Sequence, residues 1–132
     1  MRRKWGFSLM ELLIVVFIVG ILAAMALPGY GRMVERTVVR DARATLNLIY
    51  QAERMYRLDQ TVPSYGTLNN LINSRYLPNP EPNTSWDYAV LGVGAATFTG
   101  QATRTGGQFN GNTVTLDQNF DGKNYGGTHP LR

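Results

Sequence analysis

The chain has 132 residues, of which 13 are Lys or Arg and 9 are Asp or Glu, and its formal net charge is +4. It contains no cysteine, which excludes disulfides, thiolate nucleophiles and cysteine-ligated metal sites. Arg2, Arg3 and Lys4 supply three of the positive charges. The basic character therefore belongs to the N-terminus and is poor evidence for nucleic-acid binding.

An apolar run extends from Phe7 to Pro28 and carries one charged residue, Glu11. Because about 20 apolar residues span a bilayer core, residues 7–27 are predicted to form a transmembrane helix. The cationic residues before the run place residues 1–6 in the cytoplasm and the chain after the run outside. Burying a lone carboxylate in a membrane-spanning helix costs free energy, so Glu11 is expected to have a functional role that offsets this cost.

A cleaved secretory signal peptide is the alternative interpretation of this run. Residues 23–26, Ala-Ala-Met-Ala, are typical of a signal-peptide cleavage site. The apolar region of a signal peptide has about 7–15 residues, however, whereas this run is longer and includes Glu11. We therefore favour a helix that stays in the membrane.

Helical periodicity continues after the run. Apolar residues recur at steps of three and four on one face, namely Val34, Val38, Ala42, Leu46, Ile49, Ala52 and Tyr56. A second face, directed to lipid headgroups, acidic neighbours or solvent, carries Arg32, Arg36 and Arg40. Pro28, Gly29 and Gly31 disfavour a helix interior, but the pattern resumes at once. One kinked helix of about 50 residues is predicted, which ends near Leu58 or Asp59.

The C-terminal half is rich in Gly, Asn and Thr, which favours strands and turns over a second helical bundle. Apolar spacing predicts a short helix over residues 67–74, with Thr67 as its cap. Strands are predicted over residues 86–93, 96–103 and 112–118, joined as antiparallel hairpins by glycine-containing turns. The predicted fold class is α+β, with a long N-terminal helix packed on a small antiparallel sheet of about three or four strands.

The N-terminus contains the pattern Gly-Phe-Ser-Leu-x-Glu-Leu-Leu, which is followed by an apolar run and a proline. The residues that define this pattern are Lys4, Gly6, Phe7, Ser8, Glu11, Gly20 and Pro28. It resembles the N-terminus of the type IV pilin and pseudopilin family, including its prepilin-type (class III) signal. The resemblance covers residues 1 to about 58 and is architectural beyond that point.

The resemblance implies cleavage by a prepilin peptidase between Gly6 and Phe7, followed by N-methylation of Phe7. The physical properties agree, because Gly6 has no side chain to obstruct a protease and the cationic cluster holds the site at the membrane surface. The expected division of the chain is a leader peptide (1–6), a transmembrane and filament-core helix (7–28), an amphipathic helix (29–58) and a β-rich head with an αβ-loop (59–132).

We assign Glu11, Gly20 and Pro28 to filament assembly. Residues 7 and 11 are separated by one helical turn, a rise of roughly 6 Å, so the Glu11 carboxylate can pair with the amine that cleavage exposes on Phe7. An unpaired charge in an apolar core costs several kcal/mol, so this pairing favours one axial register. The alternative is an unpartnered carboxylate at the membrane edge. Between Gly20 and Pro28 the resemblance implies local loss of helicity in the filament, with a plain kink as the alternative.

A weaker signal near the C-terminus concerns calcium. Asp117, Asn119 and Asp121 follow the D-x-N-x-D-G pattern that begins a calcium loop. The bidentate Glu needed at the twelfth position is replaced by Thr128, so an Asx-rich turn is the simpler interpretation. Resemblance to calcium-binding pseudopilins keeps the metal as an alternative, and no other cofactor is expected.

Four aromatic residues at strand spacing, Trp86, Tyr88, Phe98 and Phe109, are predicted to lie in the core rather than to form a stacking platform for DNA. His129 is the single histidine. With no cysteine, no second histidine and no clustered carboxylates, we expect that the chain is not an enzyme.

The predicted function is that of a structural subunit of a type IV pilus, which polymerises through its N-terminal helix into a surface filament for adhesion, motility or DNA uptake. The first alternative is a pseudopilin of a type II secretion system, and the second is a monomeric membrane-anchored binding protein. Long surface filaments favour the pilin, calcium dependence favours the pseudopilin, and absence of processing at Gly6 favours the anchor.

Expected partners are further copies of the chain in a filament, the prepilin peptidase, the inner-membrane assembly machinery and, before assembly, membrane lipid. Direct contact with nucleic acid is not expected. The precursor is expected in the inner membrane and the assembled subunit in a periplasmic or cell-surface filament. Many members of the family close their last loop with a disulfide, so residues 125–132 of this cysteine-free chain must be held by packing or be mobile.

Overall fold

The computed structural model describes residues 6–80 and 85–132, apart from the side chains of Leu27 and Pro28. The chain divides into two compact units, Met1–Arg36 and Thr37–Arg132, which are described separately below.

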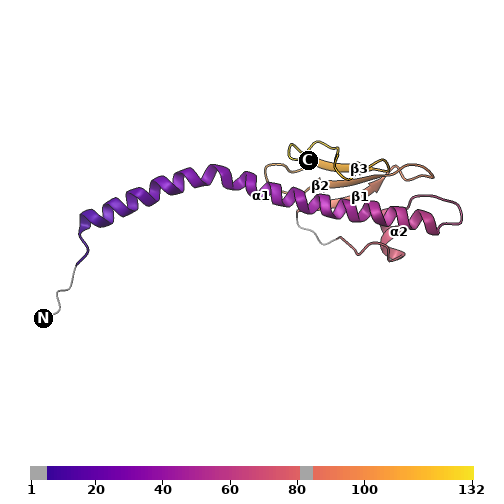
Figure 1. Cartoon of the computed structure of the whole chain (residues 1–132), viewed down its shortest axis with the longest axis horizontal. Coiled ribbons are helices and arrows are strands. Elements are labelled where there is room, and N and C mark those ends of the chain that lie inside the picture. Colours follow the sequence, from indigo (N-terminus) through magenta and orange to yellow (C-terminus); the bar gives the residue numbers. More distant parts are fainter. Residues whose placement is uncertain (1–5, 81–84) are drawn as a thin grey trace. The chain divides into compact units, whose positions relative to one another are not determined.

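Helix α1 spans Leu9–Asp59, a length of 51 residues, and remains helical through Pro28. Its first turn is capped by Ser8, whose Oγ accepts a hydrogen bond from the backbone N–H of Met10 at 3.3 Å. In Figure 1 the helix is coloured from indigo to magenta. The prediction of one helix of about 50 residues that ends near Asp59 is confirmed.

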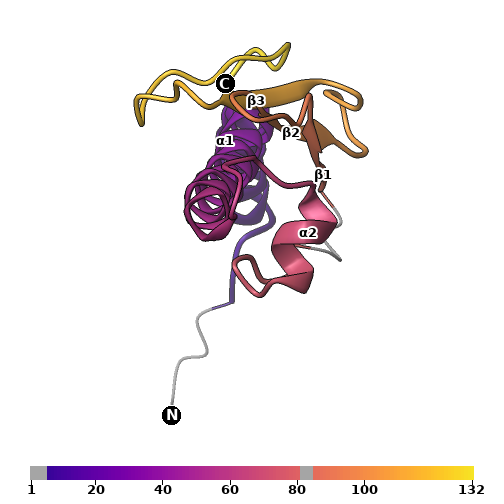
Figure 2. The same ribbon diagram turned by 90° about the vertical axis from the view of Figure 1, so that its right-hand side faces the viewer.

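In the second unit, the C-terminal part of α1 packs on a sheet that the described residues form from three antiparallel strands. These are β1 (Trp86–Leu91), β2 (Thr99–Arg104) and β3 (Thr113–Asp117), in the order β1-β2-β3. The end-on view of Figure 2 shows the sheet across one side of α1 and the short helix α2 (Leu68–Asn73) beside it. The predicted α+β class is therefore confirmed.

The core lies between α1 and the sheet. Its fully buried side chains from α1 are Val39, Ala42, Leu46, Ile49 and Ala52. The predicted apolar face is confirmed for the buried Ala42, Leu46, Ile49 and Ala52 and for Val38 and Tyr56, which are half-buried and pack against the core. It is wrong at Val34, which is exposed, and it missed the buried Val39. The reason is helical phase, because Val39 precedes Ala42 by three residues and Leu46 by seven, on the same face.

Aromatic side chains fill the sheet side of this core. Trp86 and Phe98 are fully buried and Tyr88 nearly so, which confirms the core prediction for these three residues and makes the DNA-stacking alternative wrong for them. The Trp86 indole Nε1–H donates a hydrogen bond of 2.9 Å to the backbone oxygen of Val38. This bond ties β1 to α1 and satisfies the polar atom of a buried ring.

The predicted helix and strands differ from the structure only at their ends. The Thr67 hydroxyl accepts a hydrogen bond from the backbone N–H of Asn70 at 3.3 Å, which confirms Thr67 as the cap of α2. Strand β1 ends at Leu91, two residues early, because the chain turns at Gly92 with φ of 61°. Strand β2 begins at Thr99 rather than residue 96.

The C-terminal segment, residues 125–132, is held against β3 by backbone hydrogen bonds. Thr115 and Gly126 exchange two of them, at 2.9 and 3.1 Å. The backbone N–H groups of Thr128 and His129 both donate to the carbonyl oxygen of Thr113, each at 2.9 Å. The C-terminal segment is therefore held by packing, which is the first of the two alternatives expected from the sequence.

The side chain of His129 anchors the same segment. It is fully buried, and its ring lies 5.7 Å from the Trp86 ring and 4.9 Å from the Phe109 ring, centroid to centroid. Arg43 on α1 donates a hydrogen bond of 3.0 Å to the backbone oxygen of Leu131. The segment is thus fixed to both the sheet and the helix without a covalent link.

Candidate functional site: the N-terminal segment and the Asx loop

The predicted cleavage site precedes α1 and is open. Gly6 and Phe7 lie outside the helix, and a Cβ placed on Gly6 would meet no atom within 4 Å. The Phe7 side chain is 74% exposed. A protease needs an uncovered backbone outside regular secondary structure, so this geometry suits cleavage. The basic residues 2–4 lie outside the described residues.

The first half of α1 presents apolar side chains on all sides. Over Leu9–Ala26 the mean hydropathy is 2.7, and none of these 18 residues is buried within the chain. A helix that is apolar all round is stable in lipid or among other helices. Among the described residues, this is the one helix long and apolar enough to cross a membrane, as predicted.

Glu11 lies in the first turn of α1, and its side chain is exposed. A carboxylate in the first turn is stabilised by the partial positive charge of the helix N-terminus. Ser8 closes this turn, because its backbone oxygen accepts a hydrogen bond of 3.0 Å from the Glu11 N–H. Phe7 precedes the helix, so pairing of the Glu11 carboxylate with the Phe7 amine stays a prediction.

The candidate calcium loop consists of Asx turns. The Asp117 Oδ1 accepts a hydrogen bond from the Asn119 N–H, and the Asp121 Oδ1 accepts from the N–H groups of Lys123 and Asn124, all at 2.9 Å. The hydrogen bonds from the backbone N–H groups of Asn124 and Lys123 lower the pKa of the Asp121 carboxyl below its usual value. The predicted Asx-rich turn is present.

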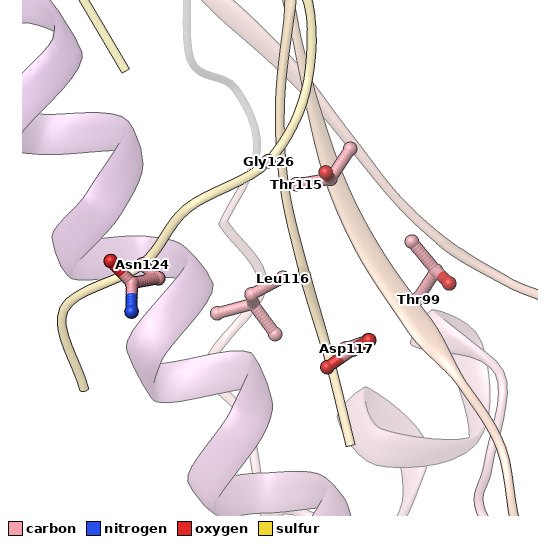
Figure 3. A pocket seen from close by; sticks show the side chains of 6 residues that line it. All are labelled: Thr99, Thr115, Leu116, Asp117, Asn124 and Gly126. Carbon is pink, nitrogen blue, oxygen red and sulfur yellow. The ribbon is translucent and has the colours of Figure 1, made fainter. Parts of the chain in front are cut away.

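A cavity of about 320 Å³ adjoins this loop, lined by Thr99, Thr115, Leu116, Asp117, Asn124 and Gly126. In Figure 3, Leu116 lies between Asp117 and Asn124. At the twelfth loop position the Thr128 hydroxyl accepts a hydrogen bond from the Thr113 N–H. Within the part of the chain that the structure describes, no three His, Cys, Asp or Glu side chains are grouped to hold a metal. Calcium binding here stays a prediction.

Comparison with known proteins found sequence matches to the same N-terminal segment. The family model described as the prokaryotic N-terminal methylation motif matches residues 1–27. The chain has the N-terminus of the type IV pilin and pseudopilin family. This pilin-type segment, residues 1–27, includes the predicted cleavage site and Glu11.

Curated relatives fall into two groups. The chain is 41% identical to the type IV major pilin protein PilA of Myxococcus xanthus over 54 residues, which is 41% of this chain and 24% of that pilin. It is 56% identical to the type IV major fimbrial protein FimA of Dichelobacter nodosus over 36 residues, 27% of this chain and 22% of that protein. It is 32% identical to the type II secretion system core protein G of Pseudomonas aeruginosa over 87 residues, 65% of this chain and 61% of that protein. The matches thus span less than two thirds of the length of each relative.

The pilin-type segment keeps its helix through the two remaining residues assigned to assembly. Both Gly20 and Pro28 lie inside α1, and no atom lies within 4 Å of a Cβ placed on Gly20. Open space around a helical glycine allows close approach of another helix. Loss of helicity between these residues in a filament stays a prediction.

Among the residues that the structure describes, two fully buried titratable residues were not predicted. Glu53 is fully buried on α1, and His129 is fully buried in the C-terminal segment. Spacing could have placed Glu53, because it follows Ile49 by four residues and Leu46 by seven on the buried face. His129 has no such periodicity around it, and its burial depends on two distant aromatic rings.

The arginines of the second predicted helix face, Arg32, Arg36 and Arg40, are all exposed.

Proposed function

We propose that this protein is a structural, non-enzymatic subunit of a type IV pilus, with its N-terminal helix in the centre of the filament. The observation that carries the proposal is the wholly exposed apolar half of α1, which holds one carboxylate at a pilin-type N-terminus. Such a surface is stable in lipid before assembly and against copies of itself afterwards. The sheet of the second unit supplies a separately packed head.

The proposed maturation begins in the inner membrane, with the N-terminus in the cytoplasm. A prepilin peptidase hydrolyses the bond between Gly6 and Phe7 and removes the cationic leader. The freed amine of Phe7 is then methylated. Loss of the leader removes the charges that hold this end at the cytoplasmic face, so inner-membrane assembly machinery can extract the subunit into a filament at the cell surface.

The proposal is tested by electron microscopy of sheared surface material, combined with mass spectrometry of the N-terminal peptide. We expect long filaments whose subunits begin with methylated Phe7. Membrane-bound chain that retains residues 1–6 would support the monomeric anchor instead.

Glu11→Ala is expected to be cleaved normally but to reduce filament yield at least tenfold. Its carboxylate is the partner that we assign to the new amine of Phe7, and removal of one member of a buried pair costs about 3–5 kcal/mol. Filament mass per cell, measured by immunoblot of sheared material, reports assembly, and the N-terminal mass reports cleavage. Glu11→Gln controls for side-chain size and should behave like the alanine variant. Normal filament yield in both variants would contradict the register role.

The second candidate function is a pseudopilin of type II secretion, favoured by the match to core protein G over 65% of this chain. Calcium dependence separates the two. If the Asx loop serves a pseudopilin, millimolar Ca²⁺ should raise the thermal midpoint of the wild-type chain but not that of Asp117→Asn. For a pilus subunit we expect no shift in either chain and filaments that survive chelator.

A further inference from the structure

Two arginines near the end of α1 each lie over a tyrosine ring. The Arg54 guanidinium carbon lies 5.8 Å from the centroid of Tyr50, and that of Arg57 lies 5.2 Å from the centroid of Tyr65. Both distances are in the range of cation–π contacts. Each guanidinium has five N–H donors, so those not directed at the ring can donate to an acceptor in the pocket.

A pocket of about 150 Å³ opens at this position, lined by Arg54, Arg57, Leu58 and Tyr65. Ligand pockets for drug-sized molecules and cofactors have about 300–1,000 Å³, so this one suits a single small group. Two of its four lining residues are arginines, and the Leu58 side chain is 85% exposed. Its shape and charge therefore select an anion of a few atoms.

Within the described part of the chain, no anion is paired with the two arginines of this pocket. Within residues 6–80 and 85–132, neither Arg54 nor Arg57 forms an ion pair or a hydrogen bond, and the Arg57 Nε is buried without an acceptor. The neighbouring carboxylates are directed elsewhere, because Glu53 accepts from the Gly66 N–H at 2.8 Å and Asp59 accepts from the Tyr76 hydroxyl. A buried donor without an acceptor is costly, which a bound acceptor would correct.

We propose that this pocket is an oxyanion-binding site, which takes one carboxylate or phosphate group between the two guanidinium groups. Paired arginines suit such a ligand because their N–H groups match its oxygens in geometry and charge. The same chemistry comes from two sources, a free small anion or an acidic side chain of a second copy of the chain. The site belongs to the second unit, and its existence is independent of the filament function.

The first test titrates inorganic phosphate into the full chain in nonionic detergent and follows the backbone amide resonances of Tyr65 and Gly66. We expect saturable shifts for wild type and at least tenfold weaker binding for Arg57→Gln. Arg57→Lys keeps the charge but loses the planar fork, so its affinity should fall between the two. The matched control is Arg40→Gln, an exposed arginine on the same helix, which should bind as wild type does.

Circular dichroism melting of each variant verifies folding, and Arg54→Gln provides a second substitution on the pocket wall if Arg57→Gln unfolds. Absence of saturable binding by folded wild type, or equal affinity in folded Arg54→Gln or Arg57→Gln, would overturn the proposal.

The second test distinguishes the two sources by sedimentation velocity of the same micellar samples. If phosphate dissociates oligomers of wild type but not those of Arg57→Gln, the ligand is an acidic side chain of a second copy. If phosphate binds without changing the oligomeric state, the ligand is a free anion. Either result supports the site once the first test has shown binding.

Discussion

Gly127→Ala is expected to detach the C-terminal segment from the sheet and to lower the thermal midpoint by about 10 °C or more. Gly127 has φ of 102°, a conformation that residues with side chains rarely adopt. A Cβ there would overlap the carbonyl group of Thr113 and lie 3.0 Å from the Cα of Val114. Both neighbours are backbone atoms of β3, so relief requires movement of the segment. We expect a loss of about 3 kcal/mol in unfolding free energy.

Gly122→Ala is the matched control for this substitution. Gly122 also has a positive φ, 89°, but no atom lies within 4 Å of a Cβ placed on it. Its substitution should therefore cost about 1 kcal/mol through backbone conformation alone. Equal losses for the two variants would show that the contact with β3 is unimportant.

Release of the segment has a local signal besides the melting temperature. The His129 ring packs on the indole of Trp86, so Gly127→Ala should change the tryptophan emission. Release of the segment should also make residues 128–132 accessible to carboxypeptidase. Carboxypeptidase digestion followed by mass spectrometry should thus trim the variant faster than wild type or Gly122→Ala.

Glu53→Gln is expected to remove most of the pH dependence of stability between pH 5 and pH 8. Burial raises the pKa of Glu53 from 4.5 to about 7, although the hydrogen bond from the Gly66 N–H opposes this shift. The Oε2 atom accepts that bond at 2.8 Å, while Oε1 is buried without a partner among the described residues. Glutamine keeps an acceptor for Gly66 and carries no charge.

The sign of the effect follows from which state holds the proton more tightly. The folded chain keeps the Glu53 proton up to about pH 7, whereas the unfolded chain loses it near pH 4.5. Stability from this group is therefore highest below pH 4.5 and declines as the pH rises to about 7. The full penalty has an upper limit of about 3 kcal/mol. Relative to wild type, Glu53→Gln should gain about 2 kcal/mol between pH 5 and pH 8.

Urea unfolding of the full chain at several pH values measures this gain. Asp87→Asn, which removes an exposed carboxylate from β1, is the control and should follow the wild-type curve. Other shifted groups titrate outside the window, because burial raises the pKa values of Tyr88 and Tyr125 and hydrogen bonds lower that of Asp121. Parallel curves for wild type and Glu53→Gln would contradict the assignment.

The sequence predicted the elements well because local rules decide them. The apolar run, the 3.6-residue period after Pro28 and the Thr67 cap each depend on residues close in the chain. The Asx turn at Asp121 is equally local, since its carboxylate bonds to groups two and three residues away. Such features are readable without knowledge of the fold.

Features that join distant segments were not predictable in this way. The anchoring of His129 needs Trp86 and Phe109, which come from other parts of the chain. The exact buried face of α1 depends on how the sheet meets the helix, which is why Val39 is fully buried whereas Val38 is only half-buried at the edge of the core. The pairing of Arg57 with the Tyr65 ring likewise depends on the path of the loop after α1.

The manner in which the C-terminal segment is fixed determines what the cell must supply for the head to mature. The segment is held by hydrogen bonds to Thr113 and Thr115 and by the burial of His129, all of which form and break reversibly. The head therefore requires no oxidant, no thiol–disulfide isomerase and no particular redox potential in order to fold. It should refold equally well with and without a reducing agent, so its folding is independent of the redox potential of its surroundings.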